Sequence, residues 1–112
     1  PMSETLEQKT CTPCRGGMPA LDPDKAGELL SQVPDWALND DTTCLSREFR
    51  FDNFRQTLDF VKQVGELAED EGHHPDIHFG WGYCRIDTQT KKIKGLHEND
   101  FILAAKIDQL AG

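Results

Sequence analysis

The sequence lacks any apolar run approaching the roughly 20 residues that a membrane-spanning helix needs, so we expect no membrane association. Its first residues also lack the apolar segment of a secretion signal, which indicates a cytoplasmic protein with reduced cysteines. Basic residues are few, 12 Lys and Arg against 20 Asp and Glu, for a net charge of −8. Proteins that bind the phosphate backbone show a basic face, so we expect no direct nucleic-acid binding.

The chain is also too short for several domains. Its 112 residues support one domain, and the 37% share of hydrophobic residues is enough for one core. Residues 1–20 are polar and interrupted by proline and glycine, so we interpret them as a flexible N-terminal arm. The single domain is then expected over residues 21–112.

Four cysteines are present, and two of them form the Cys11-x-x-Cys14 motif in the arm. A structural zinc site needs four ligands, and no second Cys or His pair stands nearby in the sequence. A thioredoxin-like motif would open a helix after a strand, which this arm does not offer. We therefore expect no metal, leave the role of this motif open, and place Cys44 and Cys84 in the core.

Apolar residues recur at helical spacing in some segments and alternate in others, which distinguishes helices from strands. The expected elements are helices over 23–33, 53–71 and 98–111, and strands over 36–38, 43–51 and 76–90. Asp22-Pro23 is a helix start, and Gly72 is a left-handed helix end. The segment 76–90 changes its apolar phase beside two glycines, so it is one bent strand or two. The expected order is α-β-β-α-β-β or α-β-β-α-β-α.

Two adjacent histidines, His73 and His74, follow the long helix and precede Pro75. Imidazole can give or take a proton near neutral pH, so the pair suggests acid–base chemistry. Because Gly72 ends the helix and Pro75 favours an extended residue before it, the two rings should point in different directions. Glu69 lies one helical turn upstream. The alternative is a solvated helix terminus, where imidazolium complements the helix dipole.

A longer pattern surrounds this pair. It reads Glu69-x-x-x-His73-His74-Pro75, then Trp81, then Gly95-Leu96-x-x-x-Asp100-Phe101-x-x-Ala104-x-x-Ile107. Over residues 22–111 the chain thereby resembles the pterin-4a-carbinolamine dehydratase family. The resemblance implies an α+β fold, a four-stranded antiparallel sheet with three helices packed on one face, and a homodimer or homotetramer. It also implies a hydro-lyase that dehydrates 4a-hydroxytetrahydropterin to quinonoid dihydropterin in tetrahydrobiopterin recycling, without a cofactor.

The resemblance assigns roles to individual residues. His73 and His74 would be the acid–base pair, with His74 the first choice for general acid, because the departing oxygen needs a proton and N5 must lose one. The implied substrate-binding positions are Glu69, Trp81, Thr90 and Asp100. Glu69 would orient an imidazole or bind the amino-pyrimidine edge of the pterin. Trp81 could instead be a core or interface aromatic, and Asp100 a helix-start residue favoured by the dipole.

One position departs from the family pattern. The family usually carries a third histidine that nine residues separate from the aromatic position, and Lys91 stands there instead. A lysine ammonium can donate a hydrogen bond or stabilise departing hydroxide, but it is no base at neutral pH unless strongly perturbed. We predict a catalytic set of His73, His74 and Lys91. The alternative is a catalytically weak or inactive pterin dehydratase-like protein for binding or assembly; a pterin-binding role tied to the molybdenum cofactor ranks lower.

Overall fold

The computed structural model describes residues 5–13 and 16–112. The elements in this part of the chain are the 3-10 turn η1 (Leu6–Gln8), α1 (Pro23–Leu30), β1 (Ala37–Leu38), β2 (Leu45–Arg50), α2 (Phe54–Glu71), β3 (Asp76–Gly80), β4 (Tyr83–Thr88), the 3-10 turn η2 (Lys91–Ile93) and α3 (Glu98–Ala111). The order of helices and strands is α-β-β-α-β-β-α. Both orders expected from the sequence are one element short, because the segment 76–90 forms two strands and the last helix still follows.

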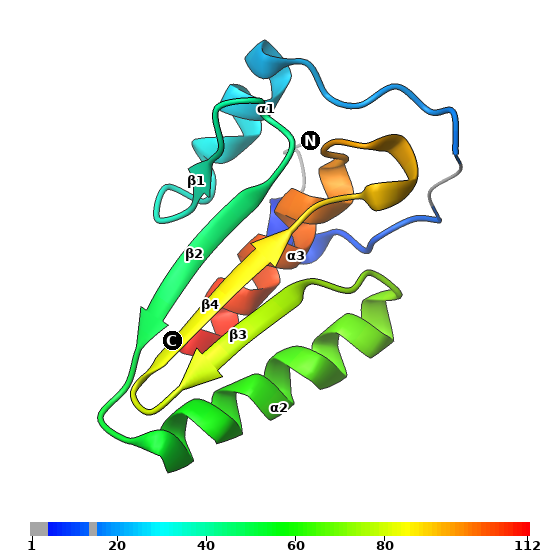
Figure 1. Ribbon diagram of the computed structural model, residues 1–112. Coiled ribbons are helices and arrows are strands. Elements are labelled where there is room, and N and C mark those ends of the chain that lie inside the picture. Colours follow the sequence, from blue (N-terminus) through cyan, green and yellow to red (C-terminus); the bar gives the residue numbers. More distant parts are fainter. Residues whose placement is uncertain (1–4, 14–15) are drawn as a thin grey trace.

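The described residues form a four-stranded antiparallel sheet in the order β1-β2-β4-β3, with the three α-helices on one face (Figure 1). This confirms the expected α+β fold. Alternation along β4 sets the two faces, because Cys84, Ile86 and Thr88 are buried whereas Tyr83 and Arg85 are exposed. The phase change predicted near the two glycines is the β3–β4 turn.

Helix ends lie where local sequence signals predict them. Asp22 Oδ1 accepts a hydrogen bond from Lys25 N at 2.8 Å, with Pro23 at the first helical position of α1. Asn53 caps α2 in the same way through Gln56 N at 2.8 Å. Gly72 ends α2 with φ of 66°, a left-handed conformation that glycine adopts without steric penalty.

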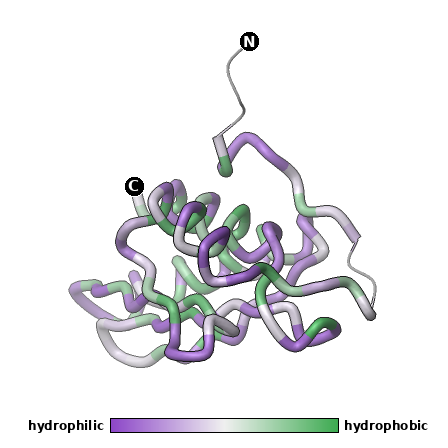
Figure 2. The backbone as a smooth tube through the Cα atoms, turned by 90° about the horizontal axis from the view of Figure 1, so that it is seen from above, coloured by the Kyte–Doolittle hydropathy of each residue, from purple (hydrophilic) through white to green (hydrophobic). Residues whose placement is uncertain are grey.

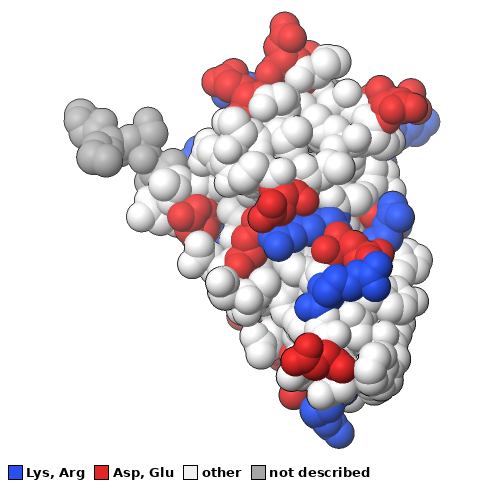
Figure 3. All heavy atoms as spheres, turned by 90° about the vertical axis from the view of Figure 1, so that its left-hand side faces the viewer, with Lys and Arg blue, Asp and Glu red and all other residues white. Residues whose placement is uncertain are grey.

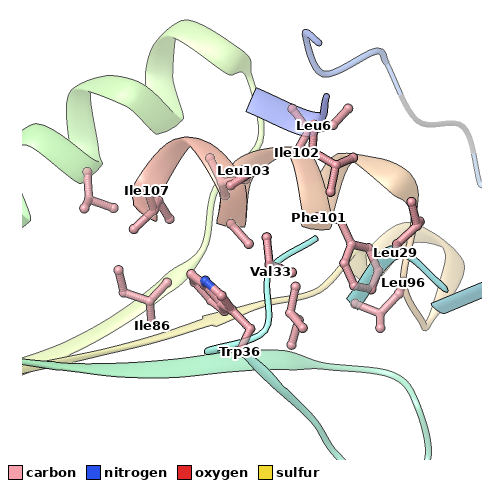
Figure 4. Packing of buried hydrophobic residues seen from close by; sticks show 14 of the residues in the cluster. Leu6, Leu29, Val33, Trp36, Ile86, Leu96, Phe101, Ile102, Leu103 and Ile107 are labelled. Atoms are coloured by element: carbon pink, nitrogen blue, oxygen red, sulfur yellow. The ribbon is translucent and has the colours of Figure 1, made fainter. Parts of the chain in front are cut away.

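The core is built around α3. Phe101, Leu103 and Ile107 of this helix are buried and pack against Val33 and Trp36 on one side of the sheet (Figure 4). In Figure 2 hydrophobic and hydrophilic stretches alternate along the helices, as expected where one face of a helix packs against the core. Because α3 is buried on nearly every side, its first turn is also held inside the molecule.

The arm is packed against the domain over residues 5–13, which differs from the expected flexible arm. Leu6 is buried and belongs to the core cluster, where it lies beside Ile102 (Figure 4). Lys9 Nζ forms an ion pair with Glu98 Oε2 at 2.9 Å. The polar composition concealed this docking because one leucine supplies the apolar anchor. Residues 1–4 and Cys14 lie outside the described residues.

The visible surface carries mixed charge. Figure 3 shows basic and acidic side chains interspersed in small groups on one side of the molecule. Arg47 illustrates the pairing, with its guanidinium 2.6 Å from Asp108 Oδ1. No helix among the described residues is both long and apolar enough to cross a membrane.

Candidate active site

A cleft of about 620 Å³ lies where the C-terminal end of α2, the loop after β4 and the N-terminal arm meet. Figure 1 shows these segments at the same end of the sheet. Residues from the end of α2, from the β4–α3 loop and from the arm line it: His73 and His74, Thr90 and Lys91, and residues 11–13. The sequence predicted the first two groups as site residues, and the structure brings them together.

His73 is rigidly held at the helix end. Its backbone N–H donates to Ala68 O at 3.2 Å, a bond that the left-handed Gly72 makes available. Its side chain is only 11% exposed, and Nε2 lies 2.6 Å from Asp100 Oδ1. An ionised carboxylate can only accept, so Nε2–H donates and Nδ1 is left as the proton-accepting nitrogen of the neutral ring.

Asp100 is fully buried and anchors the site. Among the described residues, its carboxylate accepts hydrogen bonds from His73 Nε2, from Thr88 Oγ1 at 2.6 Å, from Thr90 Oγ1 at 2.8 Å and from His97 N at 3.0 Å. The last bond closes the first turn of α3, and in the same turn His97 Nδ1 accepts a hydrogen bond from Asn99 N at 3.0 Å. Asp100 is therefore the helix-start residue that the sequence offered as one alternative, and its fully buried carboxylate holds His73 from behind the residues that line the cleft.

His74 has a different environment. Its Nε2 lies 2.5 Å from Glu69 Oε2, and the two side chains are 61% and 71% exposed. The rings of the histidine pair thus bind different helices, His73 through Asp100 of α3 and His74 through Glu69 of α2. An exposed pair of this kind contributes about 1 kcal/mol or less to stability. The contact places the imidazole of His74 beside the last turns of α2.

Lys91 lines the cleft from η2. Its side chain is 72% exposed, and Nζ lies 3.7 Å from Asp76 Oδ1 at the start of β3. The ammonium is therefore tethered at the rim of the cleft instead of being buried between the histidines.

Trp81 is not brought to the cleft. It occupies the β3–β4 turn with 71% of its surface exposed, at the end of β3 away from Pro75. The length of β3 explains why Trp81 lies away from the predicted site, because this strand carries the chain away from the histidines before the turn.

Several residues in or behind the cleft had no predicted role. Thr88 is a buried polar residue on the apolar face of β4, and its alternation with Cys84 and Ile86 was a usable signal. Glu71 and Asn99 bind the arm beside the cleft. These contacts join residues far apart in the chain, so no local sequence pattern predicts them. Within the described part of the chain, no cluster of three or more His, Cys, Asp or Glu is placed to hold a metal ion.

Charges near the arm are shifted by burial and pairing. Burial alone would raise the pKa of Glu71, but the hydrogen bond from Lys106 Nζ at 2.8 Å and that from Cys11 N at 2.8 Å outweigh it and lower the pKa. Burial, and then the charge of Glu71, raise the pKa of the Cys11 thiol to about 12. The carboxylate is therefore charged and the thiol protonated at neutral pH.

Known proteins share this sequence and this architecture. The family described as pterin 4 alpha carbinolamine dehydratase matches residues 19–110. The chain belongs to this family. A family relative from Methylococcus capsulatus is 61% identical over 96% of this chain and 94% of its own length. Another from Aromatoleum aromaticum is 56% identical over 98% of each chain.

Solved structures agree with the family assignment. A transcriptional coactivator/pterin dehydratase from Brucella melitensis aligns with a TM-score of 0.78 and 26% identity, over 83% of this chain and 99% of that one. A pterin dehydratase-like protein identified as a RuBisCO assembly factor in the alpha-carboxysome aligns with a TM-score of 0.62 and 32% identity, over 70% and 90%. The family match begins at residue 19, after most of the arm. The relatives from Methylococcus capsulatus and Aromatoleum aromaticum match almost the whole chain, so their similarity includes the arm.

Proposed function

We propose that the protein dehydrates a 4a-hydroxytetrahydropterin to the quinonoid dihydropterin by histidine acid–base catalysis. The observation that carries this proposal is the imidazole of His73, fixed on the buried Asp100 in a cleft that His74 also lines. In the reaction the C4a–O bond breaks, the oxygen leaves as water after gaining a proton, and N5 loses its proton as the C4a–N5 double bond forms. One acid and one base at the same cleft meet both needs.

His73 suits the base. Its Nε2–H is bonded to Asp100, which leaves Nδ1 to accept the N5 proton. The carboxylate then stabilises the imidazolium that forms, as a buried acid does for a catalytic histidine elsewhere. Asp100 and Thr90 act here as positioning residues, because their hydrogen bonds go to one another and to His73.

His74 suits the general acid. Its exposed ring can regain a proton from water after each turnover, and Glu69 orients it. Lys91, at the rim of the cleft, can donate a further hydrogen bond to the departing oxygen if its tether to Asp76 yields. A homodimer or homotetramer located in the cytoplasm stays a prediction.

The test is a dehydratase assay on freshly prepared 4a-hydroxytetrahydropterin. We expect the wild type to exceed the buffer rate, and His74→Ala to lose about a hundredfold in kcat. His78→Ala is the matched control, because His78 is an exposed histidine of β3 that does not line the cleft. A wild-type rate equal to buffer would contradict the proposal.

Lys91 favours one alternative, a pterin-binding protein with weak or no turnover that assembles other proteins. The ammonium is mostly exposed at the position where the family's third histidine is expected, and one solved relative is a RuBisCO assembly factor. The variant Lys91→His separates the two functions. A large gain in rate would identify the natural protein as an attenuated dehydratase, and pterin binding without turnover in both proteins would favour the alternative.

A further inference from the structure

The arm docks along the first half of α3 toward the cleft. Leu6 enters the core next to Ile102 (Figure 4). Lys9 pairs with Glu98 at the start of the helix. Figure 1 shows this segment running past the N-terminal end of α3. The docking therefore begins with an apolar anchor and continues with polar contacts as the arm approaches the histidines.

Asn99 clamps the arm at the cleft. Its Oδ1 accepts a hydrogen bond from Thr12 N at 2.9 Å, and its Nδ2 donates to Thr12 O at 2.6 Å. Asn99 is itself buried and directly precedes Asp100, the residue that holds His73. The Asn99 amide bonds both the N–H and the carbonyl of Thr12, as a neighbouring β-strand would. These two bonds fix both the position and the direction of the arm backbone at Thr12.

A second contact holds the preceding residue. Cys11 N donates to Glu71 Oε1 at 2.8 Å, and Lys106 Nζ neutralises the same carboxylate at 2.8 Å. This pair is largely buried, with side-chain exposures of 17% and 10% for Lys106 and Glu71. The thiol of Cys11 adds a contact of its own, with Sγ 3.6 Å from Asn99 O. Because these bonds hold the arm to the domain, Cys11, Thr12 and Pro13 stay in place along the cleft that they line.

The chain also returns past the same opening. A side-chain carbon added at Gly16 would lie 3.9 Å from Lys92 O, so this part of the arm passes beside η2. Further on, Leu21 N donates to Leu96 O at 2.9 Å. The arm thus borders the loop that carries Lys91 as well as the end of α2.

We propose that residues 11–13 form a fixed wall of the pterin site and that Asn99 is the positioning residue that holds this wall. The inference rests on the proposed function, because the ligand it names is the pterin ring. Cys11 and Pro13, both uncharged at neutral pH, line the cleft with a weakly polar surface against which a flat heteroaromatic ring can pack. Loosening the clamp lowers the fraction of molecules with a complete site, and apparent affinity falls by that fraction.

The experiment measures the Kd of biopterin by quenching of its fluorescence, since this oxidised pterin binds without turnover. Asn99→Leu keeps the size of the side chain and removes both bonds, and Asn99→Asp keeps the acceptor but sets a carboxylate against Thr12 O. Losing two neutral hydrogen bonds should raise the Kd about tenfold. Lys9→Ala is the control on the same arm, because its half-exposed ion pair lies away from the cleft, and its Kd should stay within about twofold of wild type.

Turnover kinetics distinguish a positioning role of Asn99 from a purely structural one, because the two roles change KM and kcat differently. In both Asn99 variants we expect KM to rise with kcat largely kept, whereas a loss of folded protein would lower kcat at unchanged KM. The amide NMR signals of Cys11 and Thr12 in the wild type should also shift on titration with biopterin, which tests the contact without any variant.

Each outcome decides the inference. An unchanged or tighter Kd in a folded Asn99 variant, or unmoved amide signals of Cys11 and Thr12, overturns the wall and leaves the dehydratase proposal intact. A wild type that binds no pterin overturns both. A wild type that binds pterin without turning it over, with weaker binding in the Asn99 variants, overturns the dehydratase proposal and supports the wall.

Discussion

Replacing Asp100 by asparagine should impair catalysis far more than folding. The change keeps the shape of the side chain but exchanges one carboxylate oxygen for an amide NH₂ group. The described donors to Asp100 divide between its oxygens, with His73 and Thr88 on Oδ1 and Thr90 and His97 N on Oδ2. In one orientation of the amide the NH₂ group faces Nε2–H of His73, and in the other it faces the backbone N–H of His97. Both groups donate to the carboxylate in the wild type.

The local chemistry selects the orientation. The backbone N–H of His97 cannot become an acceptor, so the amide oxygen should stay on that side. The hydroxyl of Thr88 can rotate to accept from the NH₂ group, and Nε2 of His73 can accept only if its proton moves to Nδ1. The ring would then present N–H where a base is required.

The two effects differ in size. Hydrogen bonds to a charged group contribute about 1.5–3 kcal/mol each, and part of that survives in the amide, so we expect a loss of about 2–4 kcal/mol in the free energy of unfolding. A domain with about 5–15 kcal/mol of stability remains folded. Fixing the wrong tautomer should lower kcat roughly a hundredfold to a thousandfold.

The assay combines urea unfolding, dehydratase kinetics and ¹⁵N NMR of the His73 ring. Thr88→Val is the matched control, because it removes a hydroxyl from the same carboxylate without placing an NH₂ group against His73. It should lower stability by about 1–3 kcal/mol and the rate only a few-fold. A folded Asp100→Asn protein with wild-type turnover, or rate losses that follow stability in both variants, would refute the reasoning.

Further expectations concern the residues that frame the cleft. Glu71→Gln should lose stability at neutral pH, and the difference from wild type should shrink as pH falls below 4.5, because a lowered native pKa stabilises the fold only while the group is ionised; urea titrations across pH measure it. Cys11, with its pKa raised to about 12, should react with iodoacetamide at pH 8 far more slowly than in the unfolded chain, and faster in Glu71→Gln, as read by peptide mass spectrometry. His97→Ser should change the free energy of unfolding by less than about 1 kcal/mol, since either side chain caps α3. Gly72→Ala should destabilise by about 1–2 kcal/mol in thermal unfolding, because its φ of 66° is left-handed.

Local signals in the sequence predicted local structure well. Asp22-Pro23 and Gly72 determine helix ends through their own side chains and backbone preferences, so the ends of α1 and α2 could be placed without tertiary contacts. The family resemblance supplied the sheet arrangement, which periodicity alone left ambiguous over residues 76–90. Two glycines there close a hairpin turn, and alternation cannot distinguish such a turn from a bend.

The site was predictable only as far as neighbouring residues determine it. His73, His74 and Glu69 adjoin one helix end, so their proximity followed from the sequence. The docking of residues 5–13 could not be predicted, because Leu6 is a single apolar residue in a polar segment, and its burial depends on a surface of α3 that is distant in the chain. Trp81 was assigned by position in a motif, although the length of β3 places it away from the cleft.

The contrast between the two histidines follows from the backbone that joins them. The left-handed Gly72 turns the chain so that His73 bonds to Ala68 O and faces α3, while Pro75 favours an extended His74 that stays beside α2. One imidazole is therefore held by a buried carboxylate and the other by an exposed one. A base must meet N5 in a fixed geometry, whereas an acid must recover its proton from water between turnovers. In the proposed reaction the same short turn would meet both conditions, because Gly72 and Pro75 direct the two imidazoles apart, and Asp100 and Glu69 then hold one ring each.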